Sequence, residues 1–258
     1  MMADKMIYQV AVGPKSKLYE HCIQSVADYA KRIGAEHIVQ RDPILMIKPN
    51  PFTSNRSEGA SRLGYLPIYE KENAFDYMDK FDQIAIIDSD VYVREDARDV
   101  FETLSPETGL AASIEGDMPI TAQYANKIKN YSRMQYQTLF PESMMDKNGY
   151  RFANMGVMVM NSKVLKPFLK GQSAKEFISR HEFQDFVDGK GAWKWSTDQT
   201  LLNNWVYKHQ IPFQNLDWRF NGLFGANTKI KECDFIHFFL KDHLPNKGED
   251  VPSLMKQI

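Results

Sequence analysis

A short apolar run in the first half of the chain constrains the fold more than any other segment. Residues Ile84 to Ile87 are four consecutive apolar residues, three of them β-branched. This composition is typical of a strand that is buried on both faces of a parallel sheet. Such sheets occur in α/β proteins, where helices cover both faces. The run therefore predicts an α/β fold with a mostly parallel central sheet flanked by helices.

Two carboxylates one residue apart follow this run. Asp88 and Asp90 alternate with Ser89, so an extended backbone places both carboxylates on one face, with α-carbons about 6–7 Å apart. Carboxylates this close repel each other unless a cation joins them. Mg²⁺ and Mn²⁺ prefer oxygen ligands and complete their coordination with substrate phosphates. The motif predicts a divalent-cation site for a diphosphate-bearing substrate; the alternative is a polar turn, because Asp and Ser are ordinary turn residues.

The length and charge of the chain narrow its class. A chain of 258 residues can form one large α/β domain or two small ones. We find no internal repeat, low-complexity tract or linker, which favours a single domain over residues 1–258. The 32 basic residues balance the 33 acidic ones, so no charge excess indicates a nucleic-acid partner, and a small-molecule partner is expected.

Cysteines and hydropathy indicate the compartment. Cys22 and Cys233 have neither metal-ligand spacing nor the density of a disulfide scaffold, and each falls within an apolar pattern typical of small buried residues. The N-terminus has no signal-peptide pattern, and no apolar run approaches the roughly 20 residues of a membrane span. We expect a soluble, cytoplasmic protein without a transmembrane segment.

Apolar periodicity and capping residues predict the remaining elements. Strands are expected at 7–12, 37–39, 81–87, 91–93, 110–114, 157–160 and 233–239, and helices at 16–33, 68–80, 124–139, 163–169, 174–187 and from residue 197 onward. Ser16 is the expected N-cap of the first helix, and Gly34 follows its end. The loop over 43–64 is long and rich in proline, and is therefore a candidate lid.

Four separate segments together resemble a known enzyme family. They are Lys71 to Asp90, Phe152 to Val159, Thr197 to Gln199 and Phe235 to Phe238. In their order and spacing, over roughly residues 6 to 247, they resemble GT-A type glycosyltransferases, which have a Rossmann-like domain, and most closely the retaining, glycogenin-like and galactosyltransferase-like family 8. The resemblance implies a nucleotide-binding part at about 1–115 and an acceptor-binding part at about 116–258.

The resemblance implies a metal site of three residues. In the family pattern, Asp88, Asp90 and His237 hold a divalent cation, Mn²⁺ or Mg²⁺, that binds the diphosphate of a nucleotide sugar, with UDP as the expected nucleotide. A neutral imidazole suits Mn²⁺ better than Mg²⁺. Taken alone, His237 would be a histidine packed in an apolar strand.

Further residues are expected to contact the donor. Lys71 precedes the Asp88 strand where related enzymes place a Lys or Arg, with Arg62 in reserve, and the alternative is a surface charge. Asn154 would place an amide beside the donor sugar, and Gly156 permits close backbone approach. The alternative for both is a turn before a core strand.

One departure from the family pattern concerns the diphosphate. The family follows its histidine with a glycine and then a lysine that touches the diphosphate, whereas here Phe238 and Phe239 follow His237. Lys241 and Lys247 are the candidate substitutes. We favour Lys247, because its distance from His237 suits a loop that returns over the phosphates. Either side chain could instead be a solvated surface lysine.

Asp198 and Gln199 are the candidate catalytic residues. They match the family's pair that faces the donor sugar and the acceptor, although an acidic residue at a helix start is also explained by capping and the helix dipole. Nearby, Trp193, Trp195 and Trp218 could stack on an acceptor sugar or belong to the core.

Together these features predict a metal-dependent glycosyltransferase. It would move a hexose from a UDP-sugar to a hydroxyl of a glycan or another acceptor, with retention of configuration as the resemblance implies. One rival is a phosphohydrolase, since Ile86 to Asp90 also resembles the nucleophile strand of haloacid-dehalogenase enzymes. The other rival is a catalytically silent sugar-binding module. Homo-oligomer formation is left open.

Overall fold

A six-stranded sheet forms the centre of the computed structural model, which describes residues 4–57, 60 and 63–258. Its order is β2-β1-β3-β8-β5-β9. Five strands run in one direction, and β8 alone is antiparallel to its neighbours. The strands are β1 (Lys5–Val10), β2 (Glu36–Gln40), β3 (Gln83–Ile87), β5 (Leu110–Ile114), β8 (Ala153–Asn161) and β9 (Phe213–Asn215). The predicted mostly parallel sheet is confirmed.

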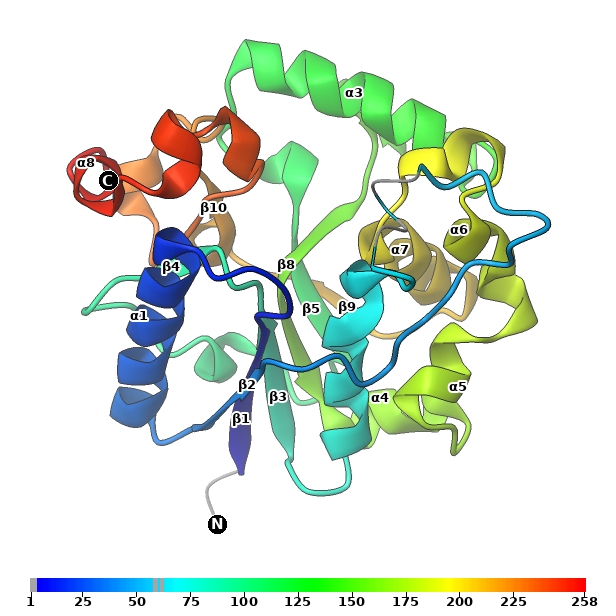
Figure 1. Cartoon of the computed structure of the whole chain (residues 1–258), viewed down its shortest axis with the longest axis horizontal. Coiled ribbons are helices and arrows are strands. Elements are labelled where there is room, and N and C mark those ends of the chain that lie inside the picture. The colour runs from blue at the N-terminus through cyan, green and yellow to red at the C-terminus, as the bar shows by residue number, and fades with distance from the viewer. Residues whose placement is uncertain (1–3, 58–59, 61–62) are drawn as a thin grey trace.

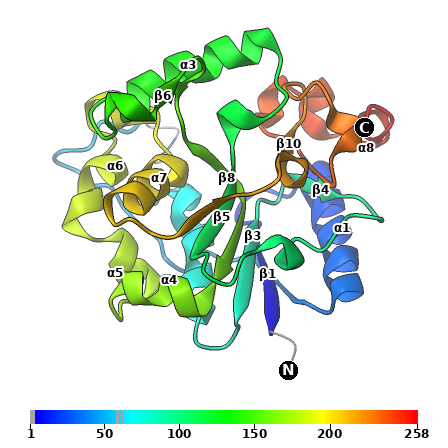
Figure 2. The same ribbon diagram turned by 180° about the vertical axis from the view of Figure 1, so that it is seen from behind.

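Helices flank both faces of this sheet, as expected for an α/β fold (Figures 1 and 2). In Figure 1, α1 lies on one side, α4 to α7 lie on the other, and α3 crosses above the start of β8. The helices are α1 (Lys17–Ile33), α3 (Ala122–Tyr136), α4 (Ser162–Leu169), α5 (Ala174–Ile178), α6 (Gln184–Asp188), α7 (Asp198–Lys208) and α8 (Val251–Met255).

Helix α1 shows how closely local sequence signals determine an element. Its buried stripe includes Leu18, Cys22 and Val26, and it ends at Gly34, whose φ of 68° lies in the left-handed region that favours glycine. Ser16 occupies the N-cap position, but its side chain makes no capping bond. The Ser16 hydroxyl instead donates to Glu249 Oε1 at 3.1 Å, which ties the start of α1 to the C-terminal segment.

Two expected helices differ from the structure. The segment expected at 68–80 is a 3₁₀ helix, Pro67–Tyr77, and buried polar side chains such as Glu70 anchor it, whereas an apolar stripe would favour an α-helix. The segment expected at 174–187 is broken into α5 and α6. At this break, Arg180 donates to the Phe168 and Leu169 carbonyls at the end of α4.

The sheet brings the polar ends of several strands to one edge. Asp88 follows β3 and Glu115 follows β5, so both acids lie where parallel strands end. Because β8 runs in the opposite direction, its first residues lie at this same edge. Ala112 pairs with Met158 but Ser113 pairs with Asn154, so residues 155–157 form a bulge relative to β5. Bulges of this kind re-aim backbone and side chains next to functional sites.

A small second sheet joins distant parts of the chain. It has the order β10-β11-β4 and contains β4 (Val91–Val93), β10 (Gly222–Leu223) and β11 (Phe235–His237). The strands β11 and β4 are antiparallel, with His237 opposite Val91. The Phe238 N–H also donates to the Asp90 carbonyl at 2.9 Å. This register places the histidine beside the second aspartate.

Buried acids hold the long loop after β2. The Glu70 carboxylate accepts the backbone N–H groups of Ile44, Leu45 and Met46 at 2.7–3.0 Å, and Asp188 accepts from the Asn50 N–H at 2.7 Å. The described part of the loop is therefore fastened at two points, while its role as a lid stays a prediction.

Two sequence expectations concern the cysteines and the membrane. Cys22 and Cys233 are both free and buried, as predicted. Among the described residues, none of the helices combines the length and the apolarity that crossing a bilayer requires.

Candidate active site

A cavity of about 600 Å³ opens at the edge of the sheet where β1 and β3 end. Its lining includes residues that lie far apart in sequence: Val10, Lys71, Asp88, Asn154, Asp198 and His237. Ligands of open α/β sheets bind outside the carboxyl ends of the strands. The cavity lies at the position expected for a nucleotide site.

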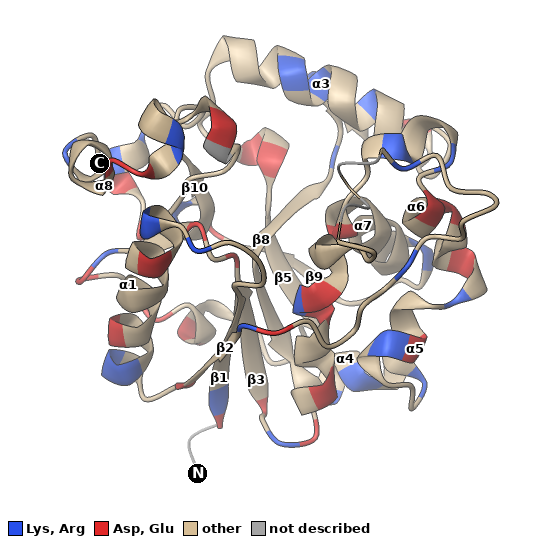
Figure 3. Cartoon of the chain, viewed as in Figure 1, with Lys and Arg blue, Asp and Glu red and all other residues tan. Residues whose placement is uncertain are grey.

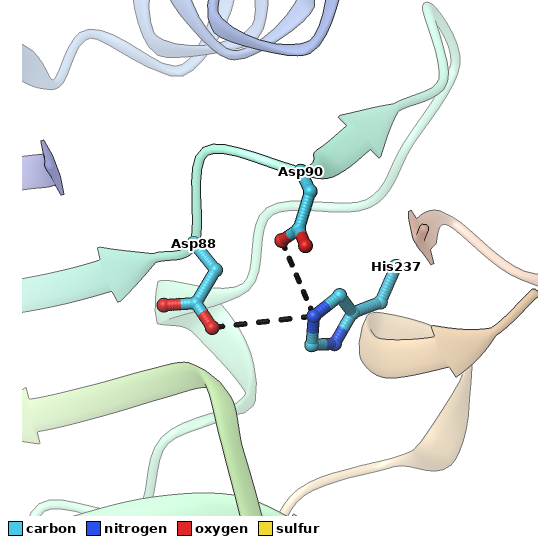
Figure 4. A group of neighbouring side chains, drawn as sticks. All are labelled: Asp88, Asp90 and His237. Atoms are coloured by element: carbon cyan, nitrogen blue, oxygen red, sulfur yellow. Dashed lines mark ion pairs between the residues drawn. The ribbon is translucent and has the colours of Figure 1, made fainter. Parts of the chain in front are cut away.

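Three of its residues form a candidate metal centre (Figure 4). Asp88, Asp90 and His237 each offer a ligand atom, and these atoms lie within 4.8 Å of one another. The His237 Nε2 atom is 3.2 Å from Asp90 Oδ1 and 4.0 Å from Asp88 Oδ2. The residues predicted to bind the cation therefore converge, although nearly 150 positions separate the aspartates from the histidine along the chain.

Charge coupling within this centre perturbs all three groups. Burial would lower the pKa of His237, but the nearby Asp90 carboxylate outweighs it and raises this pKa. Burial would raise the pKa of Asp90, but the charge and hydrogen bond of His237 hold it below its ordinary value. Burial raises the pKa of Asp88 despite the Lys71 charge. The imidazole ring and the Asp90 carboxylate therefore favour each other's charged forms.

Lys71 links the metal centre to the catalytic candidates. Its Nζ atom is 3.0 Å from Asp88 Oδ1 and 3.0 Å from Asp198 Oδ2, and it donates to the Met155 carbonyl at 2.8 Å. Burial would lower the pKa of Lys71, but the two carboxylates outweigh it and raise this pKa. The alternative of a surface charge does not describe Lys71, because its side chain is only 11% exposed.

Asp198 and Gln199 begin α7 and line the cavity. Thr197 caps this helix through its hydroxyl, which accepts from the Gln199 N–H at 3.3 Å. Asp198 is therefore not the capping residue and its carboxylate instead pairs with Lys71. The Gln199 side-chain oxygen accepts from the Met155 N–H at 3.3 Å, which holds the amide against the β8 bulge.

Asn154 and Gly156 lie inside β8, where a turn before the strand had been the alternative. The Asn154 Oδ1 atom accepts the Gly156 N–H at 2.9 Å. A Cβ atom at Gly156 would lie 2.3 Å from His237 Cε1 and 2.5 Å from His237 Nδ1. The close approach that this glycine permits is therefore to the imidazole ring.

Several predicted residues lie elsewhere or outside the described chain. Lys247 does not line the cavity, and its side chain is 73% exposed with Asp242 3.8 Å away. Arg62 and the side chain of Lys241 lie outside the described residues.

The three tryptophans also lie away from the cavity lining. Trp193 packs against Phe186 and donates to the Gln135 carbonyl. Trp195 is 60% exposed. Trp218 stacks under the Arg219 guanidinium, 4.6 Å from its ring.

Two buried residues near the metal centre, Asn221 and Glu115, were not predicted from the sequence. Asn221 Oδ1 lies 3.0 Å from His237 Nδ1, and no local pattern distinguishes it within its short 3₁₀ helix, Trp218–Asn221. Glu115 carries the same signal as Asp88, an acid directly after a buried strand, and its carboxylate accepts from Asn154 Nδ2 at 2.8 Å.

The donor set of the centre fits a divalent cation. Two carboxylates and one imidazole suit Mn²⁺ well and Mg²⁺ less well. Gly156 leaves the space that the imidazole occupies, and Lys71 adds a further positive charge beside the cluster. A site with these charges can bind a diphosphate and stabilise a departing phosphate oxygen.

Comparison with solved structures identifies the fold. A glycosyltransferase involved in the glycosylation of the major capsid of PBCV-1 aligns with 99% of this chain and 100% of its own, at 12% identity and a TM-score of 0.56. Mouse xyloside xylosyltransferase 1 aligns with 94% of this chain and 100% of its own, at 12% identity and a TM-score of 0.51. The galactosyltransferase LgtC, solved with donor and acceptor sugar analogs, aligns with 90% of this chain and 86% of its own, at 14% identity and a TM-score of 0.50.

The similarity to these proteins is one of fold. No protein-family model matches the chain, and none of the curated proteins is a significant match. The predicted GT-A type glycosyltransferase fold is nevertheless confirmed, since all three of these solved structures are glycosyltransferases. Membership of family 8 in particular stays a prediction.

Proposed function

We propose that this protein is a metal-dependent glycosyltransferase that moves a hexose from a UDP-sugar to a hydroxyl of a glycan or another acceptor. The observation that carries the proposal is the convergence of Asp88, Asp90 and His237 in one cavity of a GT-A fold. A divalent cation held by these three residues, Mn²⁺ by preference or Mg²⁺, would act as a Lewis acid toward the diphosphate.

The cavity suits the two ends of such a donor. Its lining includes Val10 to Val12, at the end of β1, where the nucleoside would lie. Asp198 and Gln199 also line the cavity, and the hexose would lie beside them. The first part of the chain, about 1–115, would bind the nucleotide, and residues from about 116–258 would bind the acceptor.

The protein's own side chains position the reacting groups. Lys71 holds Asp88 and Asp198 in a fixed relation, because its ammonium group lies 3.0 Å from both carboxylates. Its charge also favours binding of the diphosphate. Asp198 or Gln199 would be the protein group nearest the anomeric carbon, on the face that transfer with retention of configuration requires.

The test is Mn²⁺-dependent hydrolysis of UDP-glucose and UDP-galactose, together with a thermal-shift panel of nucleotide sugars with and without Mn²⁺. Asp90→Ala should abolish both the hydrolysis and the Mn²⁺-dependent shift. Asp79→Ala is the matched control, because Asp79 is 74% exposed and pairs only with Lys166 among the described residues.

Two outcomes would contradict the proposal. Steady phosphate release from a generic phosphomonoester with Mg²⁺ and no nucleotide sugar would favour the phosphohydrolase. Binding of a sugar without any Mn²⁺-dependent hydrolysis of a donor would favour the silent sugar-binding module.

A further inference from the structure

A chain of buried hydrogen bonds leads from the metal centre to the start of α3. His237 Nδ1 lies 3.0 Å from Asn221 Oδ1, and Asn221 Nδ2 donates to Asn154 Oδ1 at 2.9 Å. Asn154 Nδ2 donates to Glu115 Oε1 at 2.8 Å, and this oxygen also accepts from the Tyr124 hydroxyl at 3.2 Å. Buried networks whose members are all satisfied rigidify their surroundings.

The Gly156 N–H and the Glu115 carboxylate fix which group donates and which accepts in this series of hydrogen bonds. The backbone N–H of Gly156 can only donate, and it lies 2.9 Å from the side-chain atom of Asn154 that must therefore be Oδ1. The other end of that amide is Nδ2, which faces the Glu115 carboxylate. Asn221 must then donate to Asn154 Oδ1 through its own Nδ2, so its oxygen faces the imidazole.

An oxygen that faces His237 Nδ1 requires a proton on that nitrogen. In the neutral ring, the lone pair is then on Nε2, and Nε2 is the atom that faces Asp90 and Asp88. We propose that Glu115, Asn154 and Asn221 form a relay that holds His237 in the Nδ1–H tautomer and presents Nε2 to the cation. These three are positioning residues, and hydrogen bonds of this kind to a ligating histidine orient the ring and raise its basicity.

The relay assigns Asn154 a role different from the one expected of an amide beside the donor sugar. Its Oδ1 accepts two hydrogen bonds and its Nδ2 donates to Glu115, so both ends of the amide are bound by the protein. Replacing Asn154 or Asn221 should therefore weaken binding of the cation even when no nucleotide is present. This inference rests on the proposed metal-dependent function.

Direct titration with Mn²⁺, followed by electron paramagnetic resonance on the full chain without nucleotide, tests the role of the relay. Asn221→Ala and Asn154→Ala should each weaken Mn²⁺ binding by about 10–100-fold, the range for residues that support a metal ligand. Asn227→Ala is the matched control, because Asn227 is as buried as Asn154 but bonds to the Lys229 N–H away from the relay. Wild-type affinity in both relay variants would overturn the proposal.

The tautomer supplies a second readout that a merely structural role would not change. Long-range ¹H–¹⁵N spectra of the metal-free protein, at a pH where the ring is neutral, should show Nδ1–H for His237, identified by its loss in His237→Gln. Asn221→Ala should release this preference. A wild-type ring in the Nε2–H form would refute the relay. Absence of Mn²⁺ binding to a wild-type protein whose ring is Nδ1–H would instead refute the proposed metal-dependent function.

Discussion

Replacing Gly156 by alanine tests the geometry of the metal centre. The added Cβ would lie 2.3 Å from His237 Cε1 and 2.5 Å from His237 Nδ1. Carbon atoms in contact are normally about 3.5–4.0 Å apart, so the ring must move by about 1 Å or more. Metal–ligand distances tolerate only about 0.2 Å. We therefore expect Mn²⁺ affinity to fall by a factor of about 100 or more, since a ligand moves out of range together with its Asn221 support.

The same substitution should destabilise the fold only moderately. Inserting a methyl group into a packed interior costs about 1–3 kcal/mol, and a domain of this size tolerates such a loss. Urea unfolding measures the loss of stability, and Mn²⁺ titration followed by electron paramagnetic resonance measures the loss of Mn²⁺ affinity. Gly116→Ala is the control, because a Cβ there meets nothing closer than 3.5 Å.

The stability and the Mn²⁺ affinity of the two variants together test whether His237 binds the cation in this position. A folded Gly156→Ala protein with the wild-type affinity for Mn²⁺ would show that His237 is not a ligand in this position. Equal losses of affinity in Gly156→Ala and Gly116→Ala would show that the effect is not specific to the imidazole.

Further predictions concern the charges of the site and its surroundings. Lys71→Met should destabilise the metal-free protein by about 3–5 kcal/mol in urea unfolding, because Asp88 and Asp198 lose the ammonium group that they share. Added Mn²⁺ should restore part of this stability, and an unchanged urea midpoint in the variant would contradict the prediction. The pKa of His237 is raised, so the neutral ring that can bind a cation forms only as the pH rises above the ordinary histidine range. Mn²⁺ affinity should therefore increase with pH across and above this range, and an affinity that does not change with pH would contradict the prediction. The imidazolium pair with Asp90 stabilises the metal-free fold at low pH, and this contribution should disappear as the pH rises through the folded-state pKa of His237. Glu70→Gln should lower the free energy of unfolding, measured in urea, by about 1.5–3 kcal/mol, because it weakens the hydrogen bonds that the Glu70 carboxylate accepts from the loop after β2. The Mn²⁺ affinity of this variant should be unchanged.

Local patterns explain why much of the sheet could be predicted. The β-branched run at Ile84 identified β3, and Leu110–Ile114 was predicted with the bounds that β5 has. Each run is almost entirely apolar, with Ser113 as the exception, because both faces of its strand are covered, and this shows in a few adjacent residues. Gly34 and Thr197 likewise carry their own signals, one through a left-handed φ and the other through a capping hydroxyl.

The rest depends on contacts that no short window contains. His237 reads as a packed histidine until β11 pairs with β4 beside Asp90, and only the resemblance to a family supplied that partner. Asn221 becomes important only through atoms of Asn154 and His237, which lie on β8 and β11. The 3₁₀ helix that carries Lys71 is likewise held by side chains bound to a distant loop, and intrinsic propensity does not express such anchors.

Because β11 must pair with β4 before His237 lies beside the aspartates, a bound cation would show that this pairing has formed. Asp88 and Asp90 belong to the middle of the polypeptide, whereas His237 arrives only after the last strand has docked. A partly folded chain with an intact central sheet would lack one of its three ligands. Added Mn²⁺ would then select the fully assembled form by mass action, and the appearance of the bound-ion signal during refolding would time the docking of β11 onto β4.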